Sequence, residues 1–265
     1  MKGPGEAAED LTVQGLTDIG IDRRLGALGR DALRDLLGTA ALLVVGGLGL
    51  ARLGGFGPGY LLKAAALFAC GAWLVWRGLA NSHPHARFGA ANRVTLGRLA
   101  MSALLAAVIG ESLPHPETIA WVIVVAATVT AVLDAADGPL ARRSGLASAF
   151  GARFDMETDA WLTLVLCGLI LQFDKAGAWV LASGLMRYAF VGAARVWPWL
   201  AGELAPSLRR KTVCVVQITA LIVCLGPIIP RWASSALAAL SLILLTVSFA
   251  IDVFALSAHS RELRP

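Results

Sequence analysis

Apolar residues form eight long stretches along the chain, and short segments that carry most of the charge separate them. The stretches cover residues 37–51, 60–77, 94–110, 117–134, 157–172, 176–194, 213–229 and 233–256. A helix needs roughly 17 to 25 mostly apolar residues to cross a hydrocarbon core of about 30 Å. The pattern therefore predicts an all-α integral membrane protein with about eight transmembrane helices.

Composition supports a lipid environment for the chain. Hydrophobic residues make up 57% of the sequence and charged residues only 15%, with a mean hydropathy of +0.70. These values lie far from those of soluble globular domains. The net charge of +5 does not indicate nucleic acid, because the basic residues lie in short loops between apolar stretches, where they suit anionic lipid head groups.

The basic residues concentrate in alternate loops, which predicts an orientation. Lys and Arg near membrane ends are retained on the cytoplasmic side. One set comprises Arg23, Arg24, Arg30 and Arg34 before the first stretch; Arg77, Arg87, Arg93 and Arg98 after the second; Arg142, Arg143 and Arg153 after the fourth; Arg209, Arg210 and Lys211 after the sixth; and Arg261 and Arg264 after the eighth. We therefore expect both termini to be cytoplasmic.

The segment before the first stretch has an amphipathic pattern. Over residues 18–37 the apolar side chains lie largely on one side of a helix, namely Ile21, Leu25, Leu28, Leu33, Leu36 and Leu37, with arginines elsewhere. This favours an interfacial helix that lies on the inner leaflet. The alternative is a solvated leader.

Four aspartates stand where the hydrophobic pattern predicts membrane helices. Asp134 and Asp137 lie at the end of the fourth stretch, and Asp155 and Asp159 lie at the start of the fifth. A carboxylate at such a depth is unfavourable unless it is paired, hydrated or bound to a cation, so a functional role is the default hypothesis.

Helical spacing predicts that the aspartates meet. At 100° per residue Asp134 and Asp137 share one stripe, and Asp155 and Asp159 share another one turn apart. The ten-residue connection 143–152 lets the two helices run as antiparallel neighbours, so the two acidic faces can come together. Glu157 points in the opposite direction and is excluded from the cluster.

Such a cluster predicts a bound metal. Four like charges within a few ångströms do not all ionise unaided, so either a cation is present or some of the carboxylates are protonated. Oxygen ligands without His or Cys select hard ions such as Mg²⁺, Mn²⁺ or Ca²⁺. We predict two ions, Mg²⁺ or Mn²⁺, because a bridged pair can clamp both the attacking and the leaving oxygen at phosphorus.

The residues of this region also resemble a known signature. They read Asp134-x2-Asp137-Gly138-x2-Ala141-Arg142-x8-Gly151-x3-Asp155-x3-Asp159, which is similar to the complete motif of the CDP-alcohol phosphatidyltransferase family. Outside it, Asn92-x2-Thr95 resembles the opening of the family core. Arg210-Lys211-Thr212 with Gln217 is similar to a stretch in glycerophosphate-using members.

The resemblance implies a division of the chain. Residues 92–256 would form the catalytic core of six transmembrane helices, and residues 37–80 would add two N-terminal helices. Residues 1–36 would be a cytoplasmic segment with the interfacial helix, and residues 257–265 a cytoplasmic tail. A homodimer in a bacterial cell membrane, similar to phosphatidylglycerophosphate synthases, is the implied setting.

The resemblance also assigns roles to residues. Asp134, Asp137 and Asp155 would hold the metals, and Asp159 would contact one ion and act as the general base. Cytidine would be bordered by Gly138, Ala141 and Gly151, and Arg142 would contact the diphosphate, which suits a guanidinium fork. Asn92 and Thr95 would face the nucleotide, with helix capping as the alternative.

Basic residues near the sixth and seventh stretches are candidates for binding an acceptor. They are Arg187, Arg195, Arg210 and Lys211, with Arg209 equally well explained as a membrane anchor. A phosphorylated acceptor would need positive charge of this kind. Asp252 is left out, because a lone aspartate near the end of a membrane helix is explained either by snorkelling to the interface or by pairing with an arginine.

These observations lead to one predicted reaction. The enzyme would transfer a phosphatidyl group from CDP-diacylglycerol to an alcohol, with glycerol 3-phosphate as the leading acceptor, and release CMP. Inositol phosphate, serine, choline or a lipid are alternative acceptors. A divalent-cation or proton transporter could also place carboxylates inside a helical bundle, but it would not need the Gly-x-x-Ala-Arg segment beside them.

Overall fold

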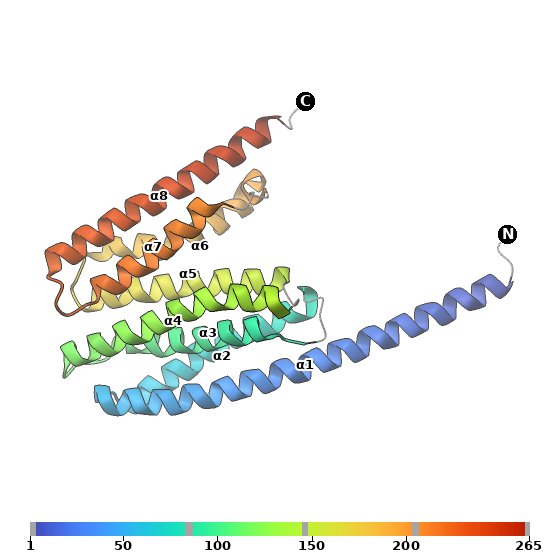
Figure 1. The fold of residues 1–265 in the computed structure, drawn as a ribbon, viewed down its shortest axis with the longest axis horizontal. Coiled ribbons are helices and arrows are strands. Elements are labelled where there is room, and N and C mark those ends of the chain that lie inside the picture. Colours follow the sequence, from blue (N-terminus) through green and yellow to red (C-terminus); the bar gives the residue numbers. More distant parts are fainter. Residues whose placement is uncertain (1–3, 83–86, 145–147, 203–206, 263–265) are drawn as a thin grey trace.

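Helices make up almost all of the chain in the computed structural model (Figure 1). The structure describes residues 4–82, 87–144, 148–202 and 207–262, with side chains over 26–79, 87–135, 148–202 and 207–258. The α-helices are α1 Pro4–Gly54, α2 Pro58–Ser82, α3 Ala90–Val108, α4 Pro116–Ser144, α5 Ala149–Gln172, α6 Leu181–Val196, α7 Leu208–Cys224 and α8 Arg231–Glu262. Two short 3₁₀ helices, η1 Ala178–Val180 and η2 Pro198–Ala201, precede and follow α6. The all-α prediction is confirmed for this part of the chain.

Each predicted apolar stretch lies mainly on one α-helix, although 176–194 also covers η1 and 213–229 continues past the end of α7. Within the described residues, four helices are long and apolar enough to cross a membrane, over Gly26–Gly54, Pro58–Leu79, Pro116–Ala135 and Arg231–Ala258. These four fit an integral membrane protein. Crossing by all eight helices remains a prediction, because α3, α5, α6 and α7 do not meet the same length and hydropathy criteria.

Helix α3 lies at the centre of the bundle. It packs against α1, α2, α4 and α5, and its side chains are buried from Leu99 to Val108 with the exception of half-buried Met101. Alanines at 100, 103, 106 and 107 allow the neighbouring helices to approach closely. By contrast, large apolar residues such as Leu42, Leu62 and Phe254 are exposed on the outer helices, as expected for surfaces that face lipid.

Helices α4 and α5 are antiparallel (Figure 1), but they are not direct packing neighbours as predicted. The main partners of α4 are α3 and α7, and each of these also packs against α5. A connection of ten residues is long enough to pass over a helix about 10 Å wide, so α3 can stand between them. This correction matters for the aspartates, because a side chain from α3 lies among them.

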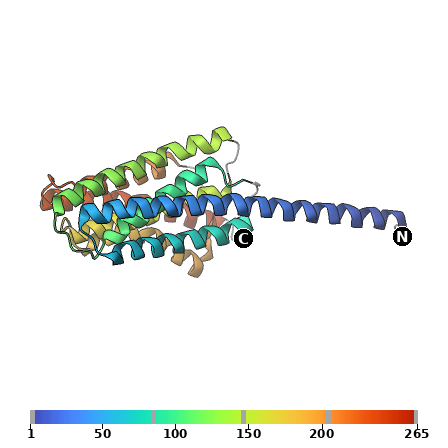
Figure 2. The same ribbon diagram turned by 90° about the horizontal axis from the view of Figure 1, so that it is seen from below.

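The predicted interfacial helix is not a separate element. Helix α1 runs without a break from Pro4 to Gly54 (Figure 2), because good helix formers dominate residues 30–37. Leu28 and Ala32 are buried against the bundle, whereas Leu33 and Leu37 are exposed. The segment therefore docks on the core through Leu28 and Ala32, and its position at the inner leaflet stays a prediction.

Both termini lie at the same end of the bundle (Figure 1). The C-terminal ends of α2 and α4 and the N-terminal ends of α3 and α5 gather at this end too. The segments that carry the basic residues of the predicted cytoplasmic loops therefore lie together. We call this the basic end of the bundle.

Candidate active site

A buried arginine lies at the centre of the candidate site. Arg98 is eight residues into α3, about 12 Å from the helix start, and its side chain is 0% exposed. One guanidinium nitrogen, Nη1, lies 2.8 Å from Asp134 Oδ1 and 2.5 Å from Asp155 Oδ1. The other, Nη2, donates to Asp159. Arg98 thus joins α4 and α5 through their carboxylates.

Asp134, Asp155 and Asp159 converge at this point. Each offers one carboxylate oxygen, and these oxygens all lie within 4.8 Å of one another. The three side chains are 26%, 37% and 17% exposed, so the cluster is partly buried and still reachable. The prediction that carboxylates from the fourth and fifth stretches meet is confirmed for these three residues.

The donor chemistry of the cluster fits a divalent cation. Carboxylate oxygens are the ligands that Mg²⁺ and Mn²⁺ prefer, and oxygens this close can share one ion. Arg98 supplies positive charge to the same oxygens, which reduces their mutual repulsion. Glu157 lies outside the cluster, as predicted, and bonds to Arg187 instead.

Several predicted residues on α4 have side chains outside the described part of the structure. They are Asp137, Gly138, Ala141 and Arg142. Helix α4 continues to Ser144, so Asp137 stays on the same helical stripe as Asp134. All four follow Asp134 along α4 toward its C-terminal end, which lies at the basic end of the bundle. Their roles stay predictions.

Two of the predicted nucleotide-binding residues come together where α3 and α5 begin. A Cβ added to Gly151 would lie only 2.9 Å from Asn92 Oδ1, so a side chain there would collide with Asn92. The Gly151 N–H donates to Ser148 Oγ at 3.0 Å, and Ser148 is the N-cap of α5. Close approach of backbone and amide therefore explains the glycine.

Asn92 and Thr95 are both buried and both bond to backbone carbonyls four residues earlier. Asn92 Nδ2 donates to Phe88 O at 2.5 Å, and the Thr95 hydroxyl donates to Ala91 O at 3.1 Å. Asn92 is not the N-cap of α3, which is Gly89. Its amide nevertheless holds the chain just before the helix, so it contributes to the start of α3.

The basic residues proposed for the acceptor do not all lie at the cluster. Arg187 Nη2 lies 2.5 Å from Glu157, on the side of α5 opposite to Asp155 and Asp159. Arg209 and Arg210 pair with Asp252 at 2.5 Å and 3.4 Å. The pairing of Asp252 with an arginine is therefore confirmed, and Arg209 fits its alternative role as an anchor.

The remaining basic candidates, Arg195 and Lys211, are exposed. Lys211 lies one turn from Cys214 on α7, and α7 packs against both α4 and α5, which carry the aspartates. One turn further along the same side is Gln217. Its side chain is buried, and neither its amide nitrogen nor its oxygen has a hydrogen-bond partner among the described residues.

Sequence reasoning placed Arg98 with the topology arginines, and this interpretation is wrong. Arg98 lies inside the predicted stretch 94–110, whereas Arg77, Arg87 and Arg93, which were grouped with it, lie before that stretch. A charged residue within a membrane span marks a functional site by default. That rule was applied to the aspartates, and it would have found Arg98 as well.

A comparison with family models identifies the core. The model described as CDP-alcohol phosphatidyltransferase matches residues 88–252, from just before α3 into α8. No match was found among curated proteins or solved structures. Members of the family are membrane enzymes that transfer substituted phosphate groups and generally use a divalent metal. Since the match covers more than half of the chain and includes Arg98 and the aspartate cluster, the protein belongs to the CDP-alcohol phosphatidyltransferase family.

Proposed function

We propose that this enzyme transfers the phosphatidyl group of CDP-diacylglycerol to glycerol 3-phosphate and releases CMP. The observation that carries the proposal is the convergence of Asp134, Asp155 and Asp159 within 4.8 Å in a partly exposed position. Family membership supports transfer from a CDP-alcohol. The choices of lipid donor and of acceptor are the proposed parts.

The three converging aspartates, together with Asp137, would hold two divalent ions, Mg²⁺ or Mn²⁺. Bound ions of this kind neutralise charge on the transferring phosphoryl group and orient the attacking and leaving oxygens. Arg98 is a positioning residue in this scheme. Its two terminal nitrogens hold carboxylates of α4 and α5 at fixed places.

Asp159 is the proposed general base. Its carboxylate bonds to Arg98 Nη2, whereas Asp134 and Asp155 share Nη1, and the choice of Asp159 over Asp155 rests on the family resemblance. It would take the proton of the acceptor hydroxyl as that oxygen bonds to the β-phosphorus. The bond from that phosphorus to the CMP oxygen breaks, and CMP leaves with the electron pair.

The nucleotide would lie between the aspartate cluster and the basic end of the bundle. Gly151 at the start of α5 abuts the amide of Asn92 on α3, and these two residues would form one wall of the nucleotide site. Gly138, Ala141 and Arg142 lie along α4 in the same direction, and Arg142 would contact the diphosphate. Thr95 is one turn from Asn92 on α3 and would complete this wall.

For the acceptor, Lys211 is the strongest candidate among the basic residues. It is exposed at the start of α7, and the same side of that helix leads inward to the buried amide of Gln217. Arg195 and Arg210 would add positive charge for a phosphate. Arg187 is no longer included, because Glu157 holds it on the other side of α5.

The setting of the reaction follows from the topology. We propose that the basic end, which collects both termini, faces the cytoplasm of a bacterial cell, since arginine-rich loops are retained there. A soluble acceptor and a membrane lipid could then both reach the cluster. A homodimer is proposed from the family resemblance alone.

The acceptor can be identified by measuring CMP release. Purified enzyme with Mg²⁺ or Mn²⁺ and radiolabelled CDP-diacylglycerol is offered glycerol 3-phosphate, inositol phosphate, serine, choline and a lipid alcohol separately. The proposal predicts release that depends on glycerol 3-phosphate. Release with a different acceptor only would overturn the acceptor and keep the family reaction, whereas no release with any of them would contradict the proposed donor.

A further inference from the structure

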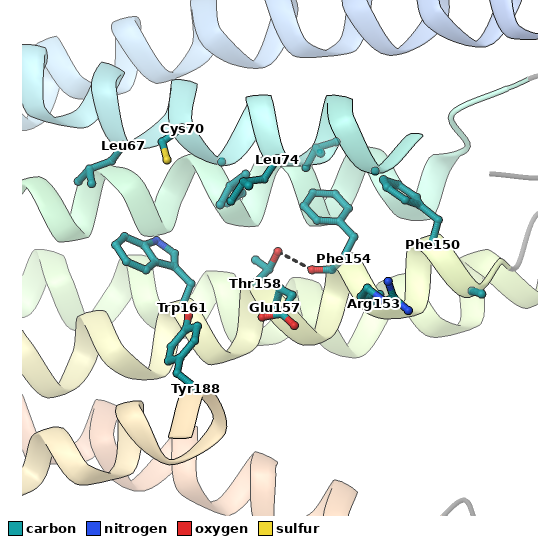
Figure 3. Close-up of a pocket in the computed structure, with 15 residues that line it drawn as sticks. Leu67, Cys70, Leu74, Phe150, Arg153, Phe154, Glu157, Thr158, Trp161 and Tyr188 are labelled. Atoms are coloured by element: carbon teal, nitrogen blue, oxygen red, sulfur yellow. Dashed lines mark hydrogen bonds between the residues drawn. The ribbon is translucent and has the colours of Figure 1, made fainter. Parts of the chain in front are cut away.

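A cavity of about 600 Å³ lies between α2 and α5, with Tyr188 of α6 beside it (Figure 3). We call it the α2–α5 groove. Its walls are mainly apolar, and the side chains that define them are Leu67, Cys70 and Leu74 on α2 and Phe150, Phe154 and Trp161 on α5. The volume falls within the range of roughly 300–1,000 Å³ that is typical of ligand sites.

The groove is long and runs parallel to the helix axes. Its lining extends from residue 67 to residue 78 on α2 and from residue 149 to residue 161 on α5, at spacings that keep to one face of each helix. At 1.5 Å per residue these walls are about 17 Å long, close to half of a hydrocarbon core of about 30 Å. Leu74 is 58% exposed, so the groove opens onto the outer surface of the bundle.

One end of the groove carries a positive charge. Arg153 lines it one turn after α5 begins, at the basic end of the bundle, and is exposed. No ion pair or hydrogen bond joins its side chain to another described residue. The only other charged residue of the lining, Glu157, is paired with Arg187 at 2.5 Å.

We propose that the α2–α5 groove binds one acyl chain of an anionic phospholipid, with the lipid phosphate beside Arg153. An apolar channel about as long as one leaflet, with a cation at its end, matches an acyl chain beneath an anionic head group. A transmembrane helix of a partner, about 10 Å wide, is a poorer fit to a cavity of this volume. The inference goes beyond the transfer reaction and does not rest on the choice of acceptor.

This lipid site is separate from the reacting site. The residues that line the groove lie on the side of α5 opposite to Asp155 and Asp159, by helical spacing. The α2 wall also lies outside residues 88–252, which match the family. The groove is therefore made partly by a segment that the family core does not include.

Cys70 offers a direct test, because its thiol is exposed and lines the groove. The full-length enzyme in detergent is treated with a small thiol-alkylating reagent alone, with added phosphatidylcholine, or with added phosphatidylglycerol. Mass spectrometry follows modification of each cysteine. We expect phosphatidylglycerol to slow alkylation of Cys70 several-fold more than phosphatidylcholine does, and Arg153→Gln to remove the difference between the two lipids.

The matched control moves the thiol by one residue. In the double variant Ala69→Cys with Cys70→Ser, the thiol is at the same depth on an exposed position outside the groove lining, and both lipids should affect it equally. Equal alkylation of Cys70 under all three conditions would overturn the proposal. Protection that follows protein concentration rather than lipid would also overturn it and would indicate a second copy in the groove.

Discussion

The two sides of α5 are built for different purposes. On one side Asp155 and Asp159 contact Arg98, a fully buried cation that also contacts Asp134. On the other side Phe154 and Trp161 border a cavity of about 600 Å³. One face therefore consists of charges held at short distances, and the other of apolar walls around open volume.

The difference shows how one helix can serve two kinds of ligand. Charged ligands need fixed partners, because unpaired carboxylates within a bundle are strongly unfavourable. Acyl chains need only apolar surface and space, so the groove can tolerate exposed side chains such as Leu74. Substitutions on the acidic face should consequently have much larger effects than substitutions on the apolar face.

The largest effect is expected for the aspartates. Asp134→Asn and Asp159→Asn should each lower the rate of CMP release by about 10²–10⁴-fold. Asp134→Asn removes a metal ligand, and Asp159→Asn removes the general base. Initial rates with radiolabelled CDP-diacylglycerol, together with size-exclusion profiles that report folding, are the measurement. Asp174→Asn is the control, because that carboxylate is exposed on a loop and paired with Arg231. Rates within tenfold of the parent for both variants would remove the proposed mechanism.

The next largest effect is expected on the stability of the metal-free enzyme when Arg98 is replaced. Arg98→Gln leaves three close carboxylates without their cation, so the metal-free enzyme should lose about 3–5 kcal/mol of stability. Because a cation at the cluster would then replace the missing charge, added Mn²⁺ should raise the melting temperature more in the variant than in the parent. Thermal unfolding in detergent with chelator and with Mn²⁺ measures both.

A control for the Arg98 prediction is Arg231→Gln, which breaks an exposed ion pair at the other end of the bundle. It should change the melting temperature little under either condition. If Mn²⁺ stabilised the parent and Arg98→Gln equally, Arg98 would have only a packing role.

A smaller effect is expected where α3 meets α5. Gly151→Ala places a methyl group 2.9 Å from Asn92 Oδ1, and such overpacking typically costs about 1–3 kcal/mol. The KM for CDP-diacylglycerol should rise roughly tenfold, as steady-state kinetics would show. Gly192→Ala on α6 meets no atom within 4 Å and should leave KM unchanged; a similar rise in both variants would refute a special role for Gly151.

The smallest effect is expected for Lys211. An exposed charge contributes about 0.2–1 kcal/mol, so Lys211→Ala should raise the KM for glycerol 3-phosphate by no more than about fivefold. The KM for CDP-diacylglycerol, measured in the same assay, should stay constant. An unchanged KM for glycerol 3-phosphate would return Lys211 to the membrane-anchoring arginines and lysines.

Much of the fold and the acidic side chains of the site could be predicted from local pattern. Apolar stretches locate the helices, because a helix in lipid must present apolar side chains over its length. Helical spacing put Asp155 and Asp159 on one face and Glu157 on the other, as observed. These features depend only on residues close together in the sequence.

The contacts that the sequence could not predict join residues that are far apart along the chain. Arg98 is 57 and 61 residues from Asp155 and Asp159 along the chain, and no periodicity brings these positions together. The insertion of α3 beside α4 and α5 has the same origin. Arg187 lies within the sixth stretch, and its position there does not show that its side chain will meet Glu157 on α5.

The first turns of α3 are tied to the N-terminal helix. Asp31 accepts a hydrogen bond from the Phe88 N–H at 3.0 Å, and Arg93 bonds to Asp35 at 2.7 Å and to Asp31 at 3.2 Å. Asn92, whose amide abuts Gly151, lies directly beside Arg93. A chain trimmed to the family-matched residues would lose both carboxylate partners of Arg93, so the shortest working enzyme should begin before Asp31.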